Sequence, residues 1–504
     1  MFRLKWVVAV GLTMGTGVVS VEQTRPGPRP PAALVASFDG LGAGFVGPQG
    51  SSTQRNPSDN SLAVGPDHVI QIVNTRLAIF TKTGTPLFGP VETRTVFRDF
   101  GGPCETQNNG DAVVRYDQLA GRWLIVMPIF SKRPLRIGSQ PGSAVGLGIR
   151  DSGLGTRTAG AEGSVPSYAM CYAISTGSDP MGPYYRYQFA RALFPDYPRP
   201  AVWPDGYYVP TSTGDDVIQK HACVVERAKM LVGGDAQEQC VIIDGVNFLN
   251  NADLDGQALP PPGAPNIILA AGGSQLNKIM EDDGIYAWTF HVDWDDTTKT
   301  KVSGPTKVPV APYHYLCDGQ LTDCVPQPGT TRRLDAQGDK LMARVIYRRI
   351  GDQESLVAVH SVNTAAGGGG VRWYEFRLDG ARNVQLYQQG TFAPDRFYRW
   401  MASPAMDRNG NIGIGYSFGG TPHFAGQRFA GRMAGDVKGR LTMKERVLAT
   451  GAAAQTTTQR WEDYTQTAMD PTDDCTIWYV GDYLKRDSSN YSTRIGAFRM
   501  PGCR

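Results

Sequence analysis

The sequence predicts an all-β fold, a β-propeller of seven blades with loop insertions, from two observations. Apolar and polar residues alternate in one short segment after another, which is the period of a β-strand, as in HVIQIVNT, RWLIVMP, IYAWTFHVDW, LMARVIYRR and IGIGYSF. The strands recur with a shared turn in which an Asp precedes Gly, Asn or Pro, and its seven copies suggest seven blades. These turns contain Asp67, Asp117, Asp205, Asp283, Asp339, Asp407 and Asp470.

The composition agrees with a chain that turns often around a large core. Of the 504 residues 60 are Gly and 35 are Pro, while 41% are hydrophobic and only 19% are charged. This balance excludes a disordered chain and a coiled coil. Only a few segments, such as VVERAKMLVGG, suit a helical turn. A pair of β-sandwiches remains the alternative, because a period of two does not distinguish a sandwich from a propeller.

The N-terminus has the pattern of a secretory signal peptide. Arg3 and Lys5 precede an apolar stretch from Trp6 to Met14, and small residues follow up to Ser20, so we expect residues 1–20 to be removed. A membrane anchor is the alternative, but the stretch is shorter than the roughly 20 residues that span a bilayer. We therefore expect a secreted protein, extracellular or periplasmic, with no membrane span.

The net charge gives no reason to expect a nucleic-acid partner. The chain has 50 basic and 47 acidic residues, and removal of residues 1–20, with Arg3 and Lys5, leaves 48 against 47. A charge of +1 does not attract a polyanion. We expect a monomer whose partner is an extracellular glycan or protein.

The eight cysteines of an exported chain predict disulfides, because oxidising compartments preserve them and none has the C-x-x-C spacing of a zinc site. We expect sequence neighbours to pair, among the 105 connectivities that eight cysteines allow. The expected pairs are Cys104 with Cys171, Cys223 with Cys240, Cys317 with Cys324, and Cys475 with Cys503.

The rest of the chain divides into a tether and one domain. Residues 21–33, VEQTRPGPRPPAA, are rich in Pro, and we expect an extended tether that does not pack. Residues 34–504 then form a single β-propeller domain. Residues 131–165, rich in Gly, Ser and Arg, interrupt two strand blocks, and we expect a mobile loop over one face.

Polar and aromatic clusters stand just before several predicted inner strands, which begin around the axis of a propeller. The clusters would therefore converge at one mouth of the channel, where carboxylates, guanidinium groups and aromatic faces suit a sugar. A purely structural role, with Asp capping turns and Trp packed between blades, is the alternative. The candidate ligand-binding residues are Asp59, Tyr197, Arg399, Trp400, Arg460, Trp461 and Tyr464.

The same region suggests two kinds of chemistry. Asp111, Asp196 and Asp463 are candidates for acid and base, because carboxylates that lie close together have their pKa values pushed apart. Calcium is the one cofactor suggested, since it prefers oxygen ligands. In NADLDG, Asp253 and Asp255 match two positions of a calcium loop, although Pro262 stands where the bidentate Glu belongs.

Three segments carry a resemblance to a known family: GDAVVRYDQLAGRWLI, FPDYPRPAVWPDGYY and RWEDYTQTAMDPTDDCTIWY. In them the chain resembles an uncharacterised family of secreted bacterial proteins with a predicted β-propeller fold, over most of the mature chain. More distantly the fold looks like that of sialidases, although Ser403 to Gly413 and Thr467 to Trp478 depart from the S-x-D-x-G-x-x-W spacing. The resemblance implies a fold and no reaction.

The sequence thus predicts a secreted propeller that binds a glycan at the mouth of its channel. A glycoside hydrolase or polysaccharide lyase that uses the mouth carboxylates is the first alternative. A protein-interaction scaffold that uses the 131–165 insertion and exposed blade edges is the second.

Overall fold

The computed structural model describes residues 21–133, 143–146, 152–153, 167–212, 219–276, 280–320 and 322–503. Residues 1–20, the predicted signal peptide, and most of the 131–165 insertion lie outside this description. Helical structure is limited to short turns, and α2 falls in the segment VVERAKMLVGG, where a turn is expected. These turns are η1 (Thr93–Phe97), α1 (Gly102–Thr106), α2 (Arg227–Met230), η2 (Thr297–Lys299) and η3 (Leu316–Gly319).

The strands of the described residues group into consecutive antiparallel sets of four, here called units 1 to 7 in chain order. Unit 1 is β5 (Ser61–Val64), β6 (His68–Val73), β7 (Arg76–Thr81) and β8 (Pro86–Glu92). Unit 2 is β9 (Val113–Asp117), β10 (Arg122–Arg133), β13 (Ser167–Ser175) and β14 (Pro183–Arg191), extended by β11 (Ser143–Gly146) and β12 (Ser152–Gly153). Unit 3 is β15 (Ala201–Val202), β16 (Gly206–Tyr208), β17 (Lys220–Glu226) and β18 (Glu238–Ile243).

Units 4 and 5 share one sheet because their first strands, β19 and β23, pair in parallel. Unit 4 is β19 (Asn250–Leu254), β20 (Asn266–Ala271), β21 (Ile285–His291) and β22 (Lys301–Val308), and unit 5 is β23 (Val345–Ile350), β24 (Gln353–Asn363), β25 (Gly369–Leu378) and β26 (Val384–Phe392). Unit 6 is β27 (Tyr398–Met406), β28 (Ile412–Gly420), β29 (His423–Arg432) and β30 (Arg446–Ala449).

Unit 7 joins the two ends of the chain. It combines β31 (Gln466–Met469), β32 (Thr476–Tyr483) and β33 (Ser492–Arg499) with β2 (Ala33–Gly42), which pairs with β33 in antiparallel register. A small hairpin of β3 (Val46–Gly47) and β4 (Gly50–Ser51) follows β2.

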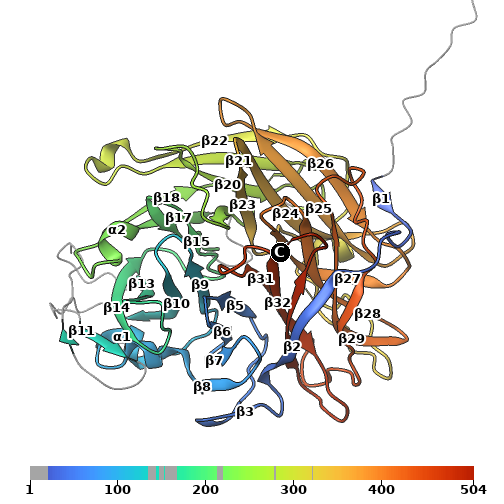
Figure 1. The fold of residues 1–504 in the computed structure, drawn as a ribbon, viewed down its shortest axis with the longest axis horizontal. Coiled ribbons are helices and arrows are strands. Elements are labelled where there is room, and N and C mark those ends of the chain that lie inside the picture. The colour runs from blue at the N-terminus through green and yellow to red at the C-terminus, as the bar shows by residue number, and fades with distance from the viewer. Residues whose placement is uncertain are drawn as a thin grey trace, which may run out of the picture.

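The first strands of the units form a closed ring. Each contacts the first strand of the next unit, from β5 through β9, β15, β19, β23 and β27 to β31, and β31 contacts β5 again. Figure 1 shows the result, since the colours follow the chain once around the molecule from blue through green and yellow to red. The predicted all-β propeller fold is confirmed.

The prediction that residues 21–33 form an unpacked tether is wrong. β1 (Glu22–Gln23) pairs in parallel with β26 of unit 5, and the buried Gln23 side chain exchanges hydrogen bonds of 2.9 and 2.8 Å with the backbone of Leu441. The Arg29 N–H donates to Thr442 O at 2.9 Å. A Pro-rich segment is extended and does not bond its own backbone, so its backbone groups are available to units 5 and 6. The segment therefore lies along these two units.

Five of the seven predicted Asp turns connect the first and second strands of a unit. Asp67, Asp117, Asp205, Asp407 and Asp470 stand between the first and second strands of units 1, 2, 3, 6 and 7. As expected of this residue type, three of them bond their own turn; the Asp407 carboxylate, for example, accepts from Asn409 N at 2.9 Å. The prediction is wrong for Asp283 and Asp339, which precede β21 and β23, the third strand of unit 4 and the first of unit 5.

All eight cysteines form disulfides, and the predicted pairing is confirmed: Cys104–Cys171, Cys223–Cys240, Cys317–Cys324 and Cys475–Cys503. Four disulfides indicate an oxidising, non-cytosolic compartment. A search of the described helices finds none with the length and apolar character of a membrane span.

Neighbouring units pack face to face through strands that are buried on both sides. Phe429 of unit 6 stacks on Phe498 of unit 7 with ring centroids 4.1 Å apart. Beside this pair, β28 carries glycines where β32 comes closest. A Cβ atom at Gly415 would lie 2.4 Å from the Tyr479 ring, so the two units pack closely only because this position has no side chain.

Replacing Gly415 by Ala should therefore destabilise the fold. Overpacking of a filled core costs about 1–3 kcal/mol, and we expect a loss of that size in the free energy of unfolding, measured by urea denaturation followed by circular dichroism. Gly435→Ala is the control, because a Cβ atom there meets no other atom within 4 Å. Equal stability of the two variants would contradict the packing argument.

Candidate functional site

Polar side chains from four units meet where the first strands begin. Asp59 precedes β5, Asp111 precedes β9, Asp196 and Tyr197 precede β15, and Arg460, Asp463 and Tyr464 precede β31. We call these seven residues the mouth cluster. The ring of first strands brings them together as the sequence predicts.

Tyr197 connects the members of the cluster from different units. Its hydroxyl donates to Asp463 O at 2.6 Å, and its backbone N–H donates to Asp111 Oδ2 at 3.4 Å. The Tyr197 and Tyr464 rings meet edge to face with centroids 5.0 Å apart. Contacts therefore run from unit 2 through unit 3 to unit 7.

A group of residues that the sequence does not predict completes the site. Three residues of it lie in the long connection before β23. Asp335 accepts from Arg460 Nε at 3.1 Å, and Gln337 donates to Asp463 Oδ1 at 3.1 Å. Lys340 donates to Gln337 Oε1. The Lys340 ammonium also lies 4.1 Å from the centre of the Phe248 ring. They precede β23, the first strand of unit 5, but the long connection carries no strand period that would mark this position.

The backbone of the mouth is unusual for residues with side chains. Left-handed φ angles cost a non-glycine residue about 1–3 kcal/mol and gather at functional sites. They occur here at Asp59 (49°), Asp111 (53°), Tyr197 (53°), Gln337 (46°), Glu462 (59°) and Asp463 (65°).

Burial and neighbouring charges alter the acids of the cluster. Burial, with the nearby Asp111 and Asp463 charges, raises the pKa of Asp59 well above its usual range. Burial also raises the pKa of Asp463, although Arg460 opposes this shift. Burial in the cluster therefore favours the neutral form of the Asp59 and Asp463 carboxyl groups, which donates a hydrogen bond.

Solvent reaches only part of the cluster. Asp59 is fully buried and Tyr464 is 3% exposed, whereas the Arg460 side chain is 40% exposed. Asp111 and Asp196 are half-buried. The surface that a ligand would meet is thus formed by Arg460, Asp111 and Asp196.

Three predicted ligand-binding residues lie elsewhere. Trp400 and Trp461 are fully buried with ring centroids 6.2 Å apart, and Trp461 Nε1 donates to Ser417 Oγ at 2.9 Å. The Arg399 side chain is buried between Asp395 and Glu445. Trp400 and Arg399 lie within β27 rather than before it, so their side chains belong to the interior of unit 6.

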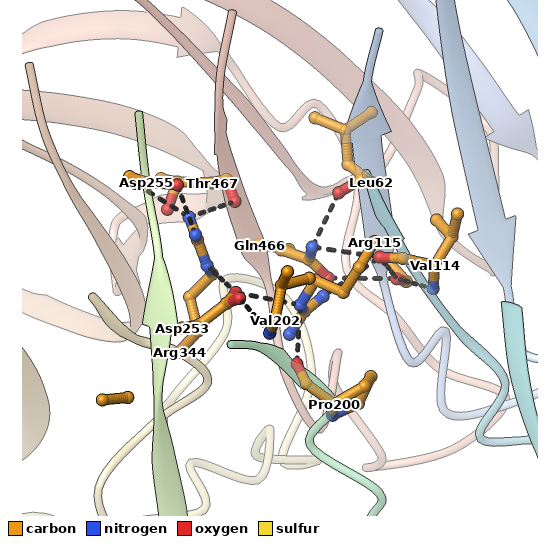
Figure 2. Close-up of polar contacts among 12 residues, drawn as sticks. Leu62, Val114, Arg115, Pro200, Val202, Asp253, Asp255, Arg344, Gln466 and Thr467 are labelled. Atoms are coloured by element: carbon orange, nitrogen blue, oxygen red, sulfur yellow. Dashed lines mark hydrogen bonds and ion pairs between the residues drawn. The ribbon is translucent and has the colours of Figure 1, made fainter. Parts of the chain in front are cut away.

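The calcium-loop interpretation of NADLDG is also wrong. Asn250–Leu254 is strand β19 and not a loop, and Arg344 takes up the carboxylates of Asp253 at 2.6 Å and Asp255 at 2.5 Å. Arg115 adds a second ion pair to Asp253 at 3.2 Å (Figure 2). Guanidinium groups thus neutralise the charge of both carboxylates. The carboxylates line a channel cavity of about 20 Å³, which has room for about one water.

Among the described residues one set of three potential metal ligands is close enough to share an ion: Cys223, Glu238 and Cys240. Both cysteines are joined in a disulfide, so they do not offer thiolates. The described mouth carboxylates do not form such a set.

Two buried acids, Glu462 and Asp482, lie next to the mouth cluster and hydrogen-bond to it and to each other. Glu462 O accepts from Asp59 N at 2.8 Å, and the Glu462 carboxylate accepts from Ser417 Oγ at 2.7 Å and Asp482 N at 2.6 Å. Burial raises the pKa of Asp482 to about 7, and burial with the Asp482 charge raises that of Glu462. Units 1, 6 and 7 are thus joined through buried acids whose pKa values are raised.

Comparisons with known proteins give similarity of fold only. No protein-family model and no curated protein matches the chain. A solved protein of unknown function from Dyadobacter fermentans is similar over 94% of this chain and 100% of its own, with 10% identity and a TM-score of 0.36. An ulvan lyase of a new polysaccharide lyase family matches over 92% and 95%, with 10% identity and a TM-score of 0.40.

The expected distant likeness to sialidases also appears. A sialidase of Trypanosoma rangeli matches over 94% of this chain and 60% of its own, with 8% identity and a TM-score of 0.37. Such low scores carry no argument about activity, and the fold described above rests on its strand pairing.

The buried acids should make stability depend on pH. An acid whose pKa is raised by folding gives stability that is present below its unfolded pKa of about 4 and is lost as pH rises through the folded value of about 7. Asp482→Asn removes this titration, so its melting temperature should fall less than that of the wild type between about pH 4.5 and about pH 8.

The matched control is Asp352→Asn, at an exposed position where the same change removes a carboxylate from the surface. It should leave the pH dependence as it is in the wild type. Parallel melting curves for Asp482→Asn and the wild type at both pH values would contradict the assignment.

Proposed function

We propose that this protein is secreted and binds an extracellular ligand, most plausibly a glycan, at the mouth cluster. The observation that carries the proposal is the convergence of an exposed guanidinium, two half-buried carboxylates and buried acids with raised pKa values. Sugar hydroxyls both donate and accept hydrogen bonds, and this set offers both kinds of partner.

One further detail of the mouth supports a ligand. The buried Tyr464 hydroxyl has no hydrogen-bond partner among the described residues, and its ring contacts Tyr197. Buried polar groups rarely remain unpaired. A ligand hydroxyl or a water beside the cluster would supply the missing partner.

The position of the tryptophans changes the expected mode of binding. With Trp400 and Trp461 in the core, neither tryptophan offers the mouth a face on which a sugar stacks. Polar contacts to Arg460, Asp111 and Asp196 then provide most of the affinity. Such contacts discriminate strongly against a sugar that lacks one of the matching hydroxyl groups, because the site's polar groups are then left unpaired.

Arg460→Ala should reduce retention of the mature protein, residues 21–504, on its polysaccharide by about tenfold or more, the size expected for a charge-assisted hydrogen bond. The measurement is affinity electrophoresis against a panel of immobilised polysaccharides. Arg486→Ala is the control, since Arg486 is exposed on the loop after β32 and outside the cluster. An equal loss of retention in the two variants would contradict the mouth cluster as the binding site.

A second candidate, a glycoside hydrolase or polysaccharide lyase, is favoured by the contact between Asp59 and Asp111. Asp59 is buried, and the Asp111 charge helps to raise its pKa. The half-buried Asp111 and Asp196 carboxylates lie close together, since Tyr197 N donates to both, at 3.4 and 3.0 Å. Two neighbouring acids in different surroundings are the arrangement that acid–base catalysis requires.

The enzyme candidate is tested by product release. If it holds, incubation with the retained polysaccharide yields new reducing or unsaturated ends with a bell-shaped pH profile, and Asp111→Asn lowers turnover by about a hundredfold or more without loss of retention. Retention without product in the wild type would leave the binding function and remove the enzymatic one. Absence of both would favour a protein-interaction scaffold.

A further inference from the structure

Unit 6 carries a groove that is separate from the mouth cluster. It lies at the turn between β28 and β29 and beside the end of β30, with a cavity volume of about 170 Å³. This is smaller than the roughly 300–1,000 Å³ of sites that enclose a drug-sized molecule. The groove therefore suits one six-membered ring.

The walls of the groove are aromatic and apolar. Phe418, His423 and Phe424 line it together with Val447 of β30. The imidazole of His423 is exposed and meets the Phe418 ring with centroids 5.4 Å apart. Val447 is 47% exposed and leaves an apolar surface that a ring would cover.

A guanidinium forms one side of the groove. Arg428 lies with its Cζ atom 3.3 Å from the centre of the Phe418 ring. Among the described residues its one hydrogen-bonded nitrogen is Nη1, which donates to Glu445 Oε1 at 2.5 Å. The other nitrogens keep donors for a ligand.

The surrounding charge favours an anion. Glu445 is already shared with the buried Arg399, which also pairs with Asp395, and the exposed Arg396 stands over the neighbouring Phe397 ring at 5.6 Å. Arg428 is the charged residue that lines the groove. The Phe397 ring lies 4.4 Å from the His423 ring, so Arg396 brings a second guanidinium close to the same side.

We propose that this groove binds a sugar ring that carries a carboxylate, a hexuronate. The apolar face of the ring would lie on Phe424 and Val447, the carboxylate would accept from Arg428, and the ring hydroxyls would meet His423 and Thr450. This inference does not depend on the proposed mouth site. It assigns a ligand to a part of unit 6 that the mouth function leaves unused.

The test uses the mature protein, residues 21–504, with D-galacturonate as probe and D-galactose as its neutral counterpart. Saturation-transfer NMR gives binding, and the His423 imidazole resonances report its place. Galacturonate should bind and shift the His423 signals, whereas galactose should bind about tenfold more weakly or worse. Equal binding of the two sugars, or no binding of galacturonate, would overturn the proposal.

Charge substitutions at the exposed lining position make the test specific. Val447→Glu should weaken galacturonate binding by about tenfold or more and Val447→Lys should preserve or strengthen it. Val437→Glu makes the same change at a position 69% exposed outside the groove and should have no effect. An equal loss in Val447→Glu and Val437→Glu, or a loss in Val447→Lys, refutes the groove.

The mouth variant separates the two proposals. Arg460→Ala should leave galacturonate binding unchanged, because Arg460 does not line the groove. If Arg460→Ala abolishes galacturonate binding while Val447→Glu does not, the sugar binds at the mouth and the groove proposal falls. If polysaccharide retention fails and the groove still binds galacturonate, only the mouth function is lost.

Discussion

The closure of the ring through unit 7 is the constraint on which the rest of the structure depends. β2 from the N-terminus pairs with β33 from the C-terminus, and β31 contacts β5 to complete the circle of first strands. Buried amides hold this junction: Gln71 of unit 1 accepts from Leu41 N at 2.8 Å and donates to Thr493 Oγ1 at 2.9 Å. Without this closure the first strands would have no common axis, and the side chains before them would not meet.

Closure of the ring also explains how residues of the mouth keep left-handed backbone conformations, which are unfavourable for residues other than glycine. The left-handed Asp59 is tied by its N–H to the left-handed Glu462, so a residue at the start of unit 1 is fixed by one at the start of unit 7. The Glu462 side chain is in turn fixed by Ser417 of unit 6 and by Asp482. Such conformations persist only where surrounding contacts determine them, and here those contacts come from neighbouring units.

The sequence predicts the fold, the disulfides and much of the mouth, because strand period, turn chemistry and chain proximity are local properties. It places Asp59, Asp111, Asp196 and Asp463 correctly since each directly precedes a first strand. It fails for Trp400 and Asp253, where only tertiary packing decides whether a polar or aromatic residue faces the channel, the core or an arginine. It misses Asp335 and Lys340 because the long connection before β23 has no period to mark its end.

The disulfides have a consequence for how the protein matures. Each joins cysteines no more than 67 residues apart, and none ties β2 to β33. Short loops close at low entropic cost, so every correct bond can form as soon as its own stretch of chain emerges, before the circle exists. Oxidative folding is thereby separated from assembly, and the docking of the two chain ends rests on non-covalent contacts alone.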